Sequence, residues 1–361
     1  MNPDFQQLMQ RATQLTRSGE LQAATAAIQA ALTSTATNHA AAPARRAEED
    51  AANVIDVAAR EVPDEAPTAP VHPQSPTPPA GRFIAGSHGD ATARRDFKLY
   101  IPPGAGDRPL PLLVMLHGCT QNPDDFAAGT AMNVLASEQG FYVLYPAQSQ
   151  RANPQRCWNW FKHNHQARGR GEPALLAGMT RDVMAAYPVD ADRVYVAGLS
   201  AGGAMAAILG DTYSDIFAAV GVHSGLAAGS ATDLPSALGA MQSGANPARP
   251  RASGRAVPTI AFHGDADATV HPANGGQVIA ASAAMAARVE VDQHNNGGRM
   301  ATRSVHHAAN GTVLAEHWLV HGASHAWSGG SAAGSYTDPR GPDASAEMLR
   351  FFLAHPRRTG H

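Results

Sequence analysis

A serine enclosed by small residues is the first place in this sequence where chemistry could occur. Ser200 stands in the string VYVAGLSAGGAM, after a β-branched and apolar run, with Gly198 and Gly202 two positions away on either side. A serine on a sharp strand-to-helix turn projects its hydroxyl outward, and crowding at such a turn leaves almost no room for side chains at those two positions. The pattern predicts a nucleophile elbow. An ordinary glycine-rich turn is the alternative, because the chain contains 34 glycines.

Two further strings place acids and histidines after strand-like runs. IAFHGDADATV contains Asp265 and Asp267, and WLVHGASHAWSGG contains His321 and His325. A carboxylate can hold a histidine by its Nδ1–H and stabilise the imidazolium that forms in turnover, and the order serine, acid, histidine is typical of serine-triad hydrolases on an α/β sheet. A zinc site at the two histidines would need a helix and a third ligand, whereas the glycine and serine between them indicate a loop.

A third string, LLVMLHGCTQ, ends a buried strand with His117 and Gly118. A loop of small residues at this point can aim a backbone N–H at a developing oxyanion, and a second N–H would come from Ala201, directly after the serine and at a helix start. We interpret His117 as a core histidine that supports the loop.

The elements that must position these residues follow from the alternation of apolar strands and helices. Helix-length stretches cover Pro173–Tyr187, Ala201–Tyr213 and Asn274–Ala287. The strand-like runs are FKLYIPP, PLLVMLHG, FYVLYPA, RVYVAGLS, FAAVGVHSG and PTIAFHGD. This alternation predicts an α/β fold with a mostly parallel sheet and helices on both faces, and working groups at the carboxyl ends of the strands.

The chain divides into three parts by composition. Residues 1–33 carry two amphipathic stretches joined by a Ser-Gly pair and predict a helical hairpin. Residues 34–81 are rich in Ala, Pro, Thr and Glu and predict a flexible linker, because they cannot bury enough apolar surface. Residues 82–357 form the predicted compact domain, and the hairpin needs a partner surface on that domain, a second copy or another molecule.

Bulk composition excludes several classes of function. The 361 residues carry a formal charge of −3 with 16% charged residues and no long basic run, which argues against nucleic acid as a partner. No apolar window approaches the length of a membrane span, and the N-terminus lacks the pattern of a secretory signal, so we expect a cytoplasmic protein. The two cysteines are too few for a disulfide-rich scaffold or a four-thiolate zinc site.

Several strings together resemble the poly(3-hydroxybutyrate) depolymerase-like esterases, whose relatives include feruloyl and acetylxylan esterases. They are LHGCTQ, CWNWF, RGRGEPALLAGM, VYVAGLSAGGAM, HGDADATVHPAN, HAWSGG and SYTDPRGPDASAEMLRFF. The resemblance spans nearly all of residues 82–355 and implies an α/β-hydrolase fold and carboxylic-ester hydrolysis without a metal or organic cofactor. It assigns the nucleophile to Ser200, the base to His325 and the acid to Asp267, which leaves Asp265 as a turn residue or an outer contact. The oxyanion would then be held by the amides of Cys119 and Ala201.

The expected substrates are hydroxyalkanoate polyesters, their oligomers or short-chain esters. Feruloyl or acetylxylan esterase activity is the alternative within the enzyme class, because all share the same triad chemistry. A hypothesis of another class makes the protein a granule-binding, self-associating or partner-binding component that docks through residues 1–33. Many relatives are exported, so an extracellular location is the alternative to the cytoplasm.

Residues around the predicted site add three expectations. Trp158, Trp160 and Trp327 could form an apolar wall for the substrate, with burial in the core as the alternative. Cys119 and Cys157 are predicted to form a disulfide that holds the oxyanion loop, with two free thiols as the alternative. Five histidines in polar surroundings are expected to face solvent: His163, His165, His294, His306 and His307.

Overall fold

The computed structural model describes residues 81–89, 94–244, 256–295 and 298–357. The chain divides into two units, Met1–Thr77 and Pro78–His361, and the described residues belong to the second. The predicted hairpin at 1–33 and nearly all of the linker at 34–81 lie outside the described residues, so both stay predictions.

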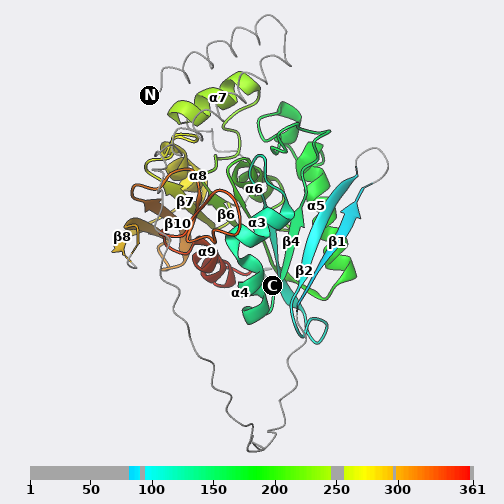
Figure 1. The fold of residues 1–361 in the computed structure, drawn as a ribbon. Helices are drawn as coiled ribbons and strands as arrows, with labels where there is room; N and C mark the ends of the chain where they lie inside the picture. The colour runs from blue at the N-terminus through cyan, green and yellow to red at the C-terminus, as the bar shows by residue number, and fades with distance from the viewer. Residues whose placement is uncertain (1–80, 90–93, 245–255, 296–297, 358–361) are drawn as a thin grey trace, which may run out of the picture. The chain divides into compact units, whose positions relative to one another are not determined.

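A single sheet organises this unit (Figure 1). In the part of the chain that the structure describes it has ten strands, in the order β1-β2-β4-β3-β5-β6-β7-β10-β9-β8. The strands from β4 to β10 pair in parallel, and the pairs outside them on both flanks are antiparallel. The strand bounds are β1 (Arg82–His88), β2 (Arg95–Ile101), β3 (Leu110–Leu116), β4 (Tyr142–Pro146), β5 (Val189–Leu199), β6 (Ala219–His223), β7 (Thr259–Gly264), β8 (Arg288–His294), β9 (Ala301–His307) and β10 (Val313–Val320).

Helices cover both faces of the sheet, as the alternation of strands and helices predicts. Their bounds are α3 (Pro123–Thr130), α4 (Met132–Gln139), α5 (Gly171–Ala186), α6 (Ala201–Thr212), α7 (Leu234–Ser243), α8 (Ala273–Ala283) and α9 (Ala344–Leu353). A short 3-10 helix η1 (His163–His165) precedes α5, and a small second sheet pairs β11 (Trp327–Ser328) with β12 (Thr337–Asp338). None of the helices in the described ranges is long and apolar enough to cross a bilayer.

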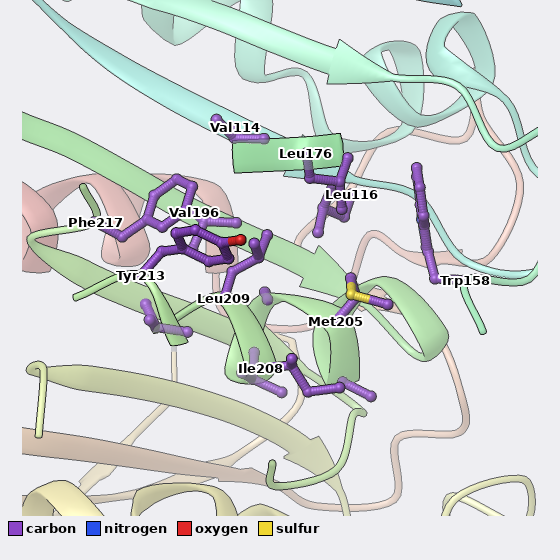
Figure 2. Close-up of a cluster of buried hydrophobic side chains, with 14 of the residues drawn as sticks. Val114, Leu116, Trp158, Leu176, Val196, Met205, Ile208, Leu209, Tyr213 and Phe217 are labelled. Atoms are coloured by element: carbon purple, nitrogen blue, oxygen red, sulfur yellow. The ribbon is translucent and has the colours of Figure 1, made fainter. Parts of the chain in front are cut away.

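The core separates into two apolar clusters because side chains alternate along each strand. In β3, Leu112, Val114 and Leu116 belong to the cluster that contains residues of α5, α6, α7 and α8. Their neighbours Leu113 and Met115 belong to the cluster that contains residues of α3, α4 and α9. Figure 2 shows part of the first cluster. Every residue of β3 is buried, which is why this central strand reads as one continuous apolar run.

The outermost strand β8 differs from the centre of the sheet. Among the described residues it pairs with β9 alone, and its first six residues are exposed. Val289 and Val291 remain 50% and 64% exposed, and charged residues alternate with them along the strand. The period-2 pattern of this strand therefore reflects one polar and one apolar face without a buried side.

Candidate active site

Ser200 lies on a sharp turn between β5 and α6. Its backbone has φ 57° and ψ −120°, and the left-handed φ of a non-glycine residue is uncommon. A Cβ on Gly202 would lie 2.0 Å from the carbonyl oxygen of Leu116, and one on Gly198 would lie 2.4 Å from backbone of Gly202. The two glycines are therefore required, as the sequence predicts. The hydroxyl makes no capping hydrogen bond with α6, which keeps it available for chemistry.

Asp267 and His325 form a largely buried acid–histidine pair after the central strands β7 and β10. His325 Nδ1 donates to Asp267 Oδ2 over 2.7 Å, while the other carboxylate oxygen accepts the backbone N–H groups of Thr269 and Val270 at 2.9 Å each. Burial alone would raise the pKa of Asp267, but the neighbouring His325 and the Val270 N–H outweigh burial and lower that pKa. The carboxylate is held in its charged form, as an acid that orients a catalytic imidazole must be.

Asp265 binds a different histidine. His321 Nδ1 donates to Asp265 Oδ2 over 2.8 Å, and the backbone N–H of Gly322 donates to the other carboxylate oxygen over 2.6 Å. Both side chains are 38% exposed, whereas that of Asp267 is fully buried. His321 and His325 follow β10 in a loop, as predicted, and no cluster of three or more potential metal ligands occurs within the described ranges.

The register of the sheet brings these groups to one edge. Leu199 pairs with His223, His223 pairs with Phe262, and Gly264 pairs with Val320, so β5, β6, β7 and β10 end side by side. Ser200, the acids and the histidine loop follow directly after these ends. The Ser200 hydroxyl makes no hydrogen bond with His325 in the part of the chain that is described, and such bonds are often long before substrate binds.

The loop after β3 carries the predicted oxyanion donor. The N–H of Gly118 donates to Gln121 Oε1 over 2.9 Å, and that of Thr120 donates to the carbonyl of Gln155 over 2.6 Å. Between them, the N–H of Cys119 donates to no acceptor among the described residues, and the same holds for that of Ala201 at the start of α6. Two unused donors on neighbouring strand ends are what an oxyanion site requires.

His117 supports this loop from inside the core, as the sequence predicts. Its Nδ1 donates to the carbonyl of Gly118 over 2.8 Å, and its Nε2 accepts the N–H of Gln148 over 3.2 Å. Burial lowers the pKa of His117 to about 4, so the ring is neutral near pH 7. A neutral ring can donate at one nitrogen and accept at the other, which the two hydrogen bonds need.

The predicted disulfide is confirmed. Cys119 and Cys157 are bonded and lie 38 positions apart in the sequence. The next residue, Trp158, donates its indole N–H to the carbonyl of His117 over 3.1 Å. The loop after β3 is thus joined to the segment after β4 by one covalent bond and one hydrogen bond.

The three tryptophans do not form an open wall beside the serine. Trp158, Trp160 and Trp327 are 0%, 5% and 1% exposed. Figure 2 shows Trp158 in the buried cluster, and Trp327 packs edge to face on Phe126 and donates to Ser345 Oγ over 3.0 Å. Their large apolar rings are enclosed by protein. The expected substrate wall is therefore wrong, and the alternative of core packing describes these residues.

Sequence reasoning missed a buried carboxylate beside the segment that carries Cys157. Glu172, near the start of α5, is 4% exposed and accepts hydrogen bonds from Gln148 and, twice, from Asn159, at 2.5 to 2.7 Å. Burial would raise the pKa of Glu172, but its partners lower that pKa on balance, beginning with His165 at 3.5 Å. The prediction that His165 faces solvent is wrong, because the ring is buried against this carboxylate. A glutamate between a glycine and a proline carries no local signal of burial.

Comparison with known proteins now decides the family. A profile described as esterase PHB depolymerase matches residues 95–304, more than half of the chain. The chain belongs to the esterase PHB depolymerase family. Poly(3-hydroxyalkanoate) depolymerase C of Paucimonas lemoignei is 32% identical over 226 residues, which cover 60% of this chain and 54% of that protein. Feruloyl esterase B of Thermothelomyces thermophilus is 31% identical over 150 residues, which cover 41% of this chain and 50% of that protein.

The chain spans about half the length of these two family relatives. Among solved structures, an acetyl xylan esterase from Aspergillus awamori superimposes with a TM-score of 0.58 at 19% identity, covering 75% of this chain and 99% of that one. This likeness shows the fold. The family member described here has the α/β-hydrolase fold that the sequence predicts, with the antiparallel flanks as an addition.

Proposed function

We propose that this member of the esterase PHB depolymerase family is a serine carboxylic-ester hydrolase. Ser200 is the nucleophile, His325 the general base and Asp267 the acid that orients it. His325 Nε2 takes the Ser200 proton as Oγ attacks the ester carbonyl, and the oxyanion is held by the amides of Cys119 and Ala201. The alcohol leaves with the proton returned by His325, and water then cleaves the acyl-enzyme by the same steps.

The hydrogen bond from His325 Nδ1 to Asp267 Oδ2 carries this proposal. It joins a buried carboxylate to a 13% exposed imidazole at the sheet edge where Ser200 stands on its strained turn. With Nδ1 used as a donor, Nε2 is the nitrogen with a lone pair for the serine proton. Core histidines also bind carboxylates, but such a pair needs neither a strained serine nor two unused N–H groups at the same edge.

We propose hydroxyalkanoate polyesters, their oligomers or short-chain esters as substrates. The similarity to a poly(3-hydroxyalkanoate) depolymerase over the larger part of the chain supports this class. Feruloyl and acetylxylan esters are the alternative, supported by the similarity to feruloyl esterase B and to an acetylxylan esterase A of Emericella nidulans, which is 28% identical over 214 residues.

A panel of substrates tests both the serine mechanism and the substrate class. The purified chain is assayed on p-nitrophenyl acetate and butyrate, methyl ferulate, acetylated xylan and amorphous poly(3-hydroxybutyrate), beside Ser200→Ala. We expect ester turnover by the wild type and a loss on the order of a millionfold in kcat for the variant. Full activity in Ser200→Ala would refute the serine mechanism, and the ranking of the panel decides the substrate class.

A function of another class, docking to a granule, a second copy or a partner through residues 1–33, stays a separate proposal.

Location is likewise a proposal: a structural disulfide persists in oxidising compartments, so the Cys119–Cys157 bond supports the extracellular alternative over the cytoplasm expected from the sequence.

A further inference from the structure

His223 contacts both halves of the proposed catalytic apparatus. It is the last residue of β6, which lies between the strand that precedes the nucleophile and the strand that precedes the acid. Its carbonyl oxygen accepts the backbone N–H of Ser200 over 2.9 Å. This bond fixes the serine main chain at the left-handed φ that aims its side chain out of the turn.

The His223 side chain reaches the loop that carries the base. Its Nε2 accepts the backbone N–H of Ser328, three residues after His325, over 2.9 Å. Because Nε2 accepts, the ring proton lies on Nδ1, which is 3.2 Å from Ser224 Oγ. Ser328 is itself buried, so removing the His223 ring nitrogen would leave the Ser328 N–H without water as a replacement acceptor.

Stacking fixes the orientation of the ring. His223 lies nearly parallel to Phe262, with ring centroids 5.8 Å apart, and at 26° to Trp327, with centroids 5.1 Å apart. Burial, then the neighbouring His263 and His325, lower the pKa of His223 to about 3. The ring therefore stays neutral, and keeps its acceptor, at every pH at which an ordinary histidine could act as a base.

We propose that His223 is a positioning residue that holds the His325 loop at a fixed distance from Ser200. The link runs from the serine N–H through one rigid, stacked residue to the main chain of the histidine loop, with no flexible side chain along it. The proposal rests on the proposed function of the triad. It goes beyond that function because His223 touches no reacting atom.

Loss of the acceptor should act on turnover rather than on substrate binding. Without it the Ser328 N–H must move to find a partner, and His325, three residues away, moves with it. A displacement of about 1 Å at a reacting group lowers the rate by up to about a hundredfold. We therefore expect kcat to fall by about tenfold to a hundredfold with KM within about twofold.

Three substitutions separate positioning from packing. His223→Phe keeps an aromatic ring between Phe262 and Trp327 but removes the acceptor. His223→Gln removes the ring but can place Oε1 where Nε2 lies, whereas His223→Asn places its oxygen nearer the backbone and cannot reach Ser328. Positioning predicts low kcat in the Phe and Asn variants and kcat within about fivefold of wild type in the Gln variant. If the ring acts only through packing, kcat should instead be higher in the Phe variant than in the Gln variant.

The measurements are kcat and KM on p-nitrophenyl acetate, the rate of serine labelling by a fluorophosphonate, and the melting temperature. His317→Leu is the matched control, because it also replaces a histidine whose side-chain nitrogen is buried in the neighbouring part of the sheet, and kcat should stay within about twofold. Where His223→Phe fails to fold, the Gln and Asn pair decides. An active His223→Phe, or a Gln variant as slow as the Asn variant, would overturn the proposal.

Wild type and Ser200→Ala are measured first on the same ester. An inactive wild type, or an active Ser200→Ala, refutes the proposed function and with it the basis for a positioning role. An active wild type with an insensitive His223 refutes the positioning role alone.

Discussion

Asp265 and Asp267 are two positions apart, yet each accepts a hydrogen bond from a different histidine. The pair of Asp267 and His325 is buried, and that of Asp265 and His321 is partly exposed. An exposed ion pair contributes little free energy because water screens it, whereas a buried one fixes the orientation of the imidazole. Because of this difference in burial, the same Asp→Asn substitution should have a large effect on kcat at one position and a small effect at the other.

Asp267→Asn should lower kcat by about a thousandfold to ten-thousandfold, because an amide at this place no longer holds the Nδ1–H tautomer of His325. Asp265→Asn should change kcat by no more than a few fold. Both are measured by steady-state kinetics on a p-nitrophenyl ester, with circular dichroism as the control for folding. A crippled Asp265→Asn beside a mild Asp267→Asn would transfer the acid role to Asp265.

The glycines around Ser200 and the polar residues after two apolar strands predicted Ser200, one of the two acids and one of the two histidines. The choice of Asp267 over Asp265 and of His325 over His321 came from the family resemblance. His223 and Glu172 leave no local signal. The first stands at the end of the apolar run FAAVGVH, and the second follows the string RGRG and precedes a proline. Their roles depend on partners 7 to 105 positions away, which only the folded chain brings together.

At the scale of elements, the apolar runs of the sequence correspond to β2 to β7, and the strand-like run before His321 corresponds to β10. The strands β1, β8 and β9 were not predicted, because at the flanks of the sheet their residues are mostly partly buried or exposed and their sequences are mixed in polarity. The predicted helices occur with ends shifted by a few residues. Burial on both faces is what makes a strand visible in a sequence.

The disulfide joins two loops and should matter for both stability and turnover. Closing 38 residues contributes about 4 kcal/mol in the chain-entropy treatment. Replacing Cys119 and Cys157 together by Ser should lower the free energy of unfolding by about that amount. It should also lower kcat, because the loop that presents the proposed oxyanion N–H at position 119 is no longer held by the covalent bond. Urea unfolding and ester kinetics measure these effects.

A thiol count on the unfolded, unreduced wild type serves as the control for this variant pair. It should find no titratable thiol. Two thiols in fully active enzyme would contradict both the bond and its link to catalysis.

At the scale of the whole molecule, three histidines that stay neutral when folded make stability depend on pH. Burial is the main cause that lowers the pKa of His117 to about 4, of His223 to about 3 and of His317 to about 4. In the unfolded chain each binds a proton near pH 6.5, whereas the folded chain does not. Unfolding therefore takes up protons below pH 6.5, and the stabilisation present above that pH is lost as the pH falls toward 4.

The free energy of unfolding should fall by about 4 kcal/mol between pH 8 and pH 5.5, from about 1.4 kcal/mol for each of the three histidines at one unit below their unfolded pKa. Denaturant titrations at both values measure it. His317→Leu should remove about one third of the difference. An equal free energy at both pH values would show that these rings are protonated in the folded protein.

The division of the chain between Thr77 and Pro78 predicts that the second unit folds and catalyses ester turnover without the first. All strands of the sheet and all triad residues lie after this point, so a chain starting at Pro78 should keep its melting temperature within a few degrees and its kcat on small esters within about twofold. Sedimentation and binding to polyester granules, compared with the full chain, test the docking proposal for residues 1–33. A lost fold or lost small-ester turnover would refute independence.

The outermost strand β8 has a consequence for how the protein behaves at high concentration. Its outer N–H and C=O groups are a template on which another extended chain could pair, and Val289 and Val291 supply the apolar face for it. Arg288, Glu290 and Asp292 alternate with these valines, so an approaching strand would have to desolvate charged side chains of both signs. Replacing these three charged residues by Thr is therefore expected to increase self-association at high concentration, which light scattering measures.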